Sequence, residues 1–196
     1  MAEASGHFRH ETGRLILRDW REEDWPRFWE LTNTPAVMRW LGGDADEATR
    51  TGARERLEGY RRDYGHTFWV IERKEDGGHL SGEMLGFCGL KRSNAEGEPV
   101  CGMMEVGWRM REDAWGHGYA KEAAIASLDL GFDRFGGDEI VALTVAGNEA
   151  SWGLMKRLGM TRREDLDFID PRWPAYLNPT IVHSITAGEW ERQNLG

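Results

Sequence analysis

Two glycines separated by one residue are the feature of this sequence that suggests chemistry most directly. Gly116 and Gly118 come after an apolar run that ends at Met110, and a helical pattern begins at Gly118. Glycine lets backbone N–H groups approach a ligand closely, and the N-terminus of a helix adds a partial positive charge. The combination predicts a cradle for a pyrophosphate group.

The same two glycines also fit an ordinary strand-to-helix turn, which can have this composition. An oxidoreductase that binds NAD(P) would need a third glycine at position 121, which is Lys121 here, and a parallel strand–helix–strand unit at this point. The sequence contains no Gly-Lys-Ser/Thr, which excludes a P-loop.

Apolar periodicity predicts the elements that must position this loop. Strands are expected at residues 14–18, 67–71, 84–90, 100–110, 140–145, 168–169 and 180–186. Helices are expected at residues 21–32, 44–64, 118–135 and 148–158. A meander of strands followed by alternating helices and strands is typical of an α/β or α+β sandwich with a mixed sheet.

The length of 196 residues fits one domain, expected at 12–190 with flexible tails at 1–11 and 191–196. A net charge of −9 argues against nucleic acid and anionic membranes as partners and weakly favours a cationic acceptor. Cys88 and Cys101 form no metal or redox pattern and the six histidines form no ligand motif, so no metal is expected. Two unpatterned thiols and the lack of a signal-like apolar start predict a cytoplasmic location.

Three sequence blocks carry a resemblance to a known family. Residues 12–20 look like an opening strand, residues 115–123 (Trp-Gly-His-Gly-Tyr-Ala-Lys-Glu-Ala) look like a cofactor loop, and residues 148–160 contain Asn-x-x-Ser followed by Lys-x-Leu-Gly. In this order and spacing the blocks resemble the GNAT superfamily of acetyl-CoA-dependent N-acetyltransferases. Within it, the chain looks like the RimJ/RimL-like branch of ribosomal-protein N-terminal acetyltransferases.

The resemblance implies a fold and a cofactor site. The GNAT fold is a mixed, mostly antiparallel sheet, here of about seven strands flanked by four helices, splayed between its central strands to admit the pantetheine arm of acetyl-CoA. By resemblance, the backbone of Trp108 and Met110 would line that arm. The pyrophosphate would be held by the loop residues Gly116, His117, Gly118, Tyr119 and Ala120.

The loop departs from the family pattern at one position. Relatives often have Gln or Arg three residues before the first glycine, where this chain has Asp113. An acidic residue is unfavourable beside a pyrophosphate, so Arg111 or Lys121 is expected to supply the positive charge.

The resemblance also implies catalytic residues. Glu105 matches a glutamate that removes a proton from the amine, directly or through water, in some relatives. Ser151 matches a serine that protonates the leaving thiolate, and Asn148 would cap the helix and contact the pantetheine. Both residues also have a purely structural alternative. Glu105 could form an ion pair, and Ser151 could cap the helix itself. His183 sits in an apolar run, where a core residue is more common than a catalytic one.

The predicted function is transfer of the acetyl group from acetyl-CoA to a primary amine, either a protein N-terminal amine or a small-molecule amine. Direct attack in a ternary complex is expected, since no cysteine or serine lies in a nucleophile-elbow or triad pattern. A non-catalytic module that binds or senses acyl-CoA is the alternative. The ten tryptophans would allow a homodimer, and Trp25, Trp29 and Trp40 could line an acceptor groove or pack in the core.

Overall fold

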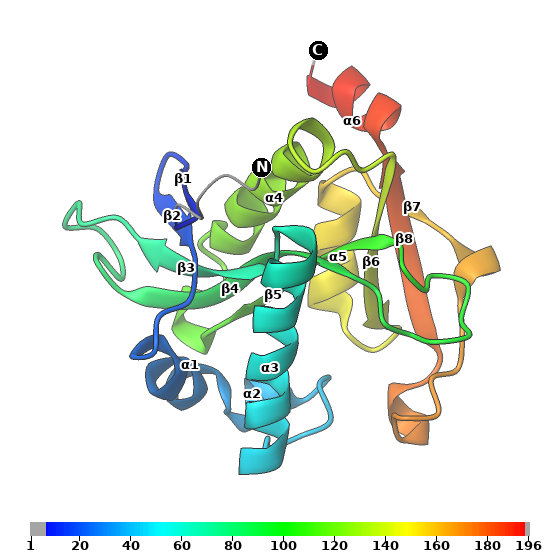
Figure 1. Ribbon diagram of the computed structural model, residues 1–196, viewed down its shortest axis with the longest axis horizontal. Coiled ribbons are helices and arrows are strands. Elements are labelled where there is room, and N and C mark those ends of the chain that lie inside the picture. The colour runs from blue at the N-terminus through cyan, green and yellow to red at the C-terminus, as the bar shows by residue number, and fades with distance from the viewer. Residues whose placement is uncertain (1–6, 195–196) are drawn as a thin grey trace.

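An eight-stranded mixed sheet runs through the molecule (Figure 1). The computed structural model describes residues 7–194. The strands are β1 (Arg9–Glu11), β2 (Leu15–Arg18), β3 (Phe68–Arg73), β4 (Met84–Arg92), β5 (Met104–Met110), β6 (Glu139–Val145), β7 (Thr161–Arg162) and β8 (Thr180–Thr186). Their order across the sheet is β1-β2-β3-β4-β5-β6-β8-β7. The expected mixed, mostly antiparallel sheet is confirmed, with eight strands in place of about seven.

Helices cover both faces of the sheet. They are α1 (Asp24–Thr32), α2 (Pro35–Met38), α3 (Glu47–Tyr64), α4 (Tyr119–Asp133), α5 (Glu149–Arg157) and α6 (Ala187–Asn194). Figure 1 shows α1, α2 and α3 in the lower half of the view and α4 and α6 in the upper half. None of these helices has the length and apolar character needed to cross a membrane.

Alternation along the strands assigns side chains to the two faces. On β3, Trp69 and Ile71 belong to the core beneath α4 and α5, whereas Phe68 and Val70 belong to the clusters beneath α1 and α3. The sheet is therefore buried on both sides, which explains why its inner strands read as nearly continuous apolar runs.

The sheet opens between β5 and β6, the one parallel pair of strands within residues 7–194. β5 and β6 pair at Met104↔Ile140 and Glu105↔Val141 and at no later position. β5 nevertheless stays paired with β4 up to Met110, and β6 stays paired with β8 up to Val145. The two halves of the sheet therefore diverge after Glu105, which confirms the expected splay between the central strands.

The expected flexible tails are wrong where the structure describes them. Arg9–Glu11 forms β1, and Phe8 stacks on Trp69 with 4.3 Å between ring centroids. At the other end, α6 continues to Asn194, and its buried Trp190 donates Nε1–H to Asp129 at 2.8 Å. Strand pairing and Phe8 hold the first end, and Trp190 holds the second, so the folded unit extends beyond 12–190. Residues 1–6 and 195–196 lie outside the described part of the chain.

Smaller differences concern short elements. The strand expected at 168–169 is only an isolated bridge between Phe168 and Thr180, and residues 100–102 form turns before β5 begins at Met104. Neither β7 nor α2 was expected from the sequence. Elements of two to four residues have too few positions to show a period, so their place depends on tertiary packing.

Candidate active site

A cavity of about 950 Å³ lies where β5 and β6 diverge. This volume falls in the range typical of small-molecule and cofactor sites. Its walls near the divergence include Val106, Trp108, Met110, Leu143, Val145, Ser151 and Leu154. Both diverging strands and α5 therefore line one continuous space, which also reaches the aromatic side chains of α1.

The glycine loop closes one end of this cavity. Gly116 and Gly118 have φ of +77° and +78°, a conformation that a side chain with a Cβ rarely adopts. A Cβ built on Gly116 would meet nothing within 4 Å, so its backbone faces open space. Gly118 is the N-cap of α4, as the sequence predicts. Gly116 and Ala120 line the cavity, whereas His117, Gly118 and Tyr119 are not among its walls.

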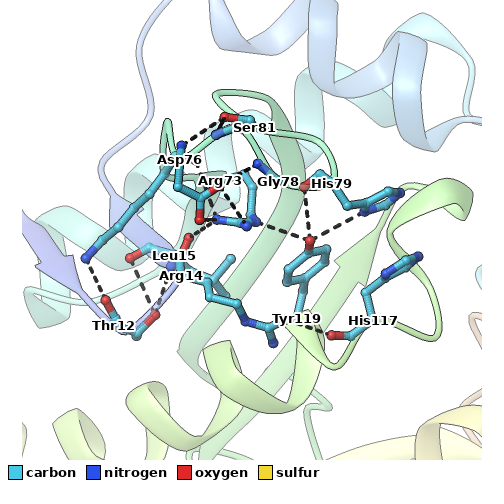
Figure 2. A network of polar contacts seen from close by, with 12 residues as sticks. Thr12, Arg14, Leu15, Arg73, Asp76, Gly78, His79, Ser81, His117 and Tyr119 are labelled. Carbon is cyan, nitrogen blue, oxygen red and sulfur yellow. Dashed lines mark hydrogen bonds and ion pairs between the residues drawn. The ribbon is translucent and has the colours of Figure 1, made fainter.

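The turn between β1 and β2 clamps the loop from outside (Figure 2). Arg14 donates from Nη1 to the carbonyl of His117 at 3.0 Å and from Nε to Glu122 at 2.7 Å. The Arg14 amide and the Thr12 hydroxyl donate to the other oxygen of Glu122 at 2.7 and 2.6 Å. Burial alone would raise the pKa of Glu122, but these hydrogen bonds outweigh burial and lower it.

The side chain of Tyr119 points toward His79, in the loop that joins β3 and β4 (Figure 2). Its hydroxyl accepts a hydrogen bond from Arg73 Nε at 3.1 Å and donates to the carbonyl of His79 at 3.0 Å. The His79 ring stacks on the His117 ring, with 3.8 Å between centroids. These contacts hold the Tyr119 side chain outside the cavity walls.

The acidic residue in the loop is already neutralised. Arg111 donates to Asp113 at 2.6 Å and lies 3.2 Å from Glu83. The Arg111 guanidinium holds the pKa of Asp113 below its usual value. Arg111 thus removes the unfavourable charge of Asp113, and its direct contact with a cofactor stays a prediction.

Glu105 reaches the cavity as expected, but it does so paired. Lys91 on β4 lies directly opposite Glu105 in the strand register, and its Nζ is 2.7 Å from Oε2. Both side chains line the cavity. The ion pair that the sequence left open for Glu105 is present, and it lies inside the candidate site.

The sequence allowed either Asn148 or Ser151 to cap α5, and the structure assigns the cap to Asn148. Asn148 is the N-cap of α5, and its side chain accepts a hydrogen bond from the Ser151 amide at 3.4 Å. The Ser151 hydroxyl forms no hydrogen bond with any described residue. Both residues line the cavity, so the hydroxyl of Ser151 is free of the capping role.

One part of the cavity wall is aromatic. Trp25, Trp29 and Trp40 line it, and Trp25 and Trp29 are also buried in the packing of α1. His183 is buried on β8 and is absent from the cavity walls. Burial lowers the pKa of His183, as expected for a core histidine. Within residues 7–194 no group of three or more His, Cys, Asp or Glu side chains could hold a metal.

Sequence reasoning missed the residues that brace the loop. Arg14 and Glu122 lie inside blocks singled out for other reasons, and Arg73 and His79 were not singled out. The Arg14–Glu122 contact joins positions 108 residues apart. A motif of neighbouring residues cannot predict a contact between positions so far apart in the sequence.

Comparison with known proteins is consistent with this geometry. Residues 14–161 match the family model described as an acetyltransferase (GNAT) domain. An uncharacterized protein of Bacillus subtilis (strain 168), YkkB, is 35% identical over 153 residues, covering 76% of this chain and 83% of YkkB. An uncharacterized N-acetyltransferase of the same organism, YnaD, is 30% identical over 77% of this chain and 81% of its own length.

Solved structures share the fold. An acetyltransferase from Agrobacterium tumefaciens str. C58 superposes with a TM-score of 0.73 at 24% identity, covering 94% of this chain and 98% of that one. A spermidine N-acetyltransferase from Vibrio cholerae, in complex with CoA and spermine, superposes with a TM-score of 0.70 at 16% identity, covering 92% and 99%. At these identities the likeness concerns the fold alone.

Proposed function

Since the chain belongs to the GNAT acetyltransferase family, we propose that it transfers the acetyl group from acetyl-CoA to a primary amine. The acceptor is a protein N-terminal amine or a small-molecule amine, and it attacks directly in a ternary complex. The observation that carries the proposal is the cavity at the divergence of β5 and β6, closed at one end by the glycine loop.

The residues present fit acetyl-CoA. After Glu105 the β5 edge that faces β6 has no strand partner among the described residues, so the backbone of Trp108 and the N–H of Met110 are available to a pantetheine arm. The Met110 carbonyl accepts a hydrogen bond from Trp115 Nε1 at 3.1 Å. The open backbone at Gly116 and the N-terminus of α4 suit a pyrophosphate. In this proposal the cofactor is held by residues 116–120 of the glycine loop, by Asn148 and by Arg111. Arg111 contributes by neutralising the negative charge of Asp113, which would otherwise repel the pyrophosphate.

Two side chains would move protons. Glu105 takes the proton of the attacking amine, directly or through water, while Lys91 holds the carboxylate in place. Ser151 donates a proton to the leaving thiolate, since Asn148 already caps the helix. Each such group contributes about 10²–10⁴-fold to a rate.

The first experiment is a thermal-shift titration with acetyl-CoA, CoA and NAD(P). A ligand at a hundred times its Kd stabilises a native protein by about 2.7 kcal/mol. We expect both CoA species to raise the melting temperature and NAD(P) to leave it unchanged. A shift with NAD(P) alone would favour the oxidoreductase, and no shift with CoA would overturn the proposal.

Catalysis is tested by release of free thiol from acetyl-CoA in the presence of an amine panel. Tight CoA binding without thiol release across that panel would favour the non-catalytic module.

The role of Glu105 is tested separately by Glu105→Gln. This variant should lose the acid limb of the pH profile of kcat/KM, because the base that titrates there is gone. An unchanged acid limb would reject Glu105 as the base.

Finer assignments stand as proposals from the sequence. Assignment to the RimJ/RimL-like branch depends on the three sequence blocks. The cytoplasmic location depends on the unpatterned thiols, and the homodimer on the tryptophan content.

A further inference from the structure

Arg109 is a cation in the cavity wall without a partner. Its Cζ lies 5.5, 5.4 and 5.5 Å from the ring centroids of Phe28, Trp29 and Phe87. Its Nε and Nη1 atoms are buried and have no hydrogen-bond partner within residues 7–194. No described carboxylate forms an ion pair with it.

An unpartnered arginine in such a setting requires an explanation. Burial lowers the pKa of Arg109 to about 10, so the guanidinium still carries its charge at neutral pH. Proteins rarely bury a charge without hydrogen bonds, because the lost hydration is costly. The aromatic faces attract the cation, but they accept none of its N–H groups in the plane of the guanidinium.

The strand register places Arg109 on the side away from the glycine loop's helix. Met104, Val106 and Met110 of β5 belong to the core beneath α4. Because side chains alternate between the two faces of a strand, Arg109 points to the face opposite these three residues, where it lies over the rings of Phe28 and Trp29 on α1. It therefore faces the aromatic part of the cavity, where an acceptor would sit, and not the N-terminus of α4.

The charges around the cavity reinforce this placement. Glu105 and Asp170 are its acidic wall residues, and each is paired, with Lys91 and Arg172 respectively. The remaining cations in the wall have no carboxylate partner within the described chain; they are Arg39, Arg56, Arg109 and Arg157. The cavity is thus positively charged although the chain as a whole carries −9.

We propose that the amine acceptor carries a carboxylate on an apolar or aromatic body, and that Arg109 binds this carboxylate. The inference rests on the proposed function and narrows its acceptor class. The Nη2 atom of Arg109 is not among its buried nitrogens and forms no hydrogen bond with a described residue, so it can donate a charge-assisted hydrogen bond to this carboxylate from the cavity side. The positive surroundings also favour the neutral, nucleophilic form of the amine. Whole-chain charge alone favours a cationic acceptor, and the local charges favour the opposite.

The test compares two probes with the same aromatic body, the anion 3-phenylpropionate and the neutral 3-phenylpropanamide. Calorimetry measures their binding to the wild type, with and without saturating CoA. We expect the acid to bind about tenfold more tightly than the amide. Arg109→Gln should abolish this preference, and Arg56→Gln, which removes an exposed cation from the same cavity, should keep it.

Each remaining outcome has a definite meaning. Equal binding of acid and amide by the wild type overturns the inference. Loss of CoA affinity in Arg109→Gln, with the acid preference intact, assigns Arg109 to the cofactor and also overturns it. Failure of CoA to bind the wild type contradicts the proposed function alone, because the acid preference is still measured without CoA.

Turnover gives an independent readout. Phenylalanine and phenylalaninamide are compared as acceptors by thiol release. A KM for phenylalanine that rises about tenfold in Arg109→Gln, with kcat and the KM for acetyl-CoA unchanged, supports the carboxylate role. A lower kcat with unchanged KM values contradicts it.

Discussion

Two arginines of the same sheet, the buried Arg18 and the half-buried Arg109, have opposite surroundings. At the closed region, defined by Arg18, Asp24 and Glu72, the guanidinium donates to Asp24 at 2.7 and 2.9 Å and to Glu72 at 2.8 Å. At the open region, defined by Arg109 and its three aromatic neighbours, the buried nitrogens donate to no described residue. Both regions touch α1, so the same helix packs against a satisfied cation and an unsatisfied one.

The difference separates two uses of charge. The closed region is complete without a ligand, and its geometry fixes the start of α1 against β2 and β3. The open region is incomplete in the protein alone, as expected where a site gives up stability for binding. We therefore expect changes in the closed region to alter stability and changes in the open region to alter turnover or binding.

The largest expected effect comes from Asp24→Asn. The change replaces the buried carboxylate beside Arg18 by a neutral amide and leaves the partly exposed Glu72 as its remaining charged partner. Removing one member of a buried pair costs about 3–5 kcal/mol. Urea unfolding at neutral pH measures the loss. Glu72→Gln is the control, because Arg18 keeps Asp24 and the loss should be smaller. A loss in Asp24→Asn no larger than that of a surface ion pair would remove the contrast between the two regions.

Ser151→Ala should change turnover without changing stability. We expect kcat to fall about 10²-fold, equivalent to about 2.7 kcal/mol, because the thiolate loses its proton donor. The free energy of unfolding should stay constant, since Asn148 caps α5. Asn148→Ala is the matched control and should lower stability by about 1 kcal/mol. An unchanged kcat in Ser151→Ala would reject the assignment.

Glu122→Gln tests the clamp on the glycine loop. Hydrogen bonds to a charged group contribute about 2 kcal/mol, and this variant should lose about that much stability at neutral pH. The folded-state pKa of Glu122 is lowered from 4.5, so its contribution is present above that value and disappears as the pH falls through the folded pKa. The difference between wild type and variant in urea unfolding should therefore shrink below pH 4.5. A difference that is independent of pH would show that the carboxylate charge contributes nothing.

The smallest expected effect is that of Arg109→Met. The methionine side chain can keep the contact with the aromatic rings, and the change removes an unpaired, half-buried charge. The free energy of unfolding should therefore stay constant or rise by about 0.5–1 kcal/mol. Urea unfolding alongside Asp24→Asn makes the comparison direct. A loss above about 1 kcal/mol, typical of an ordinary destabilising substitution, would show that Arg109 supports the fold.

What could be predicted from the sequence depended on how local each feature is. The glycine loop and the Asn148–Ser151 cap lie within a few consecutive residues, so motif and spacing located them. The Lys91–Glu105 pair follows from the register of β4 and β5, which a single sequence does not fix. The aromatic surroundings of Arg109 come from α1 and β4, and only the folded chain brings them together.

The clamp between Arg14 and Glu122 gives the molecule a built-in reporter. The Arg14 amide proton is held by a partly buried carboxylate on the first turn of α4. Its exchange with deuterium requires local opening of that contact, so its exchange rate measures how often the turn detaches from the loop. Slower exchange at Arg14 upon ligand addition would thus record ordering of the cofactor loop, at a position 108 residues away in the chain.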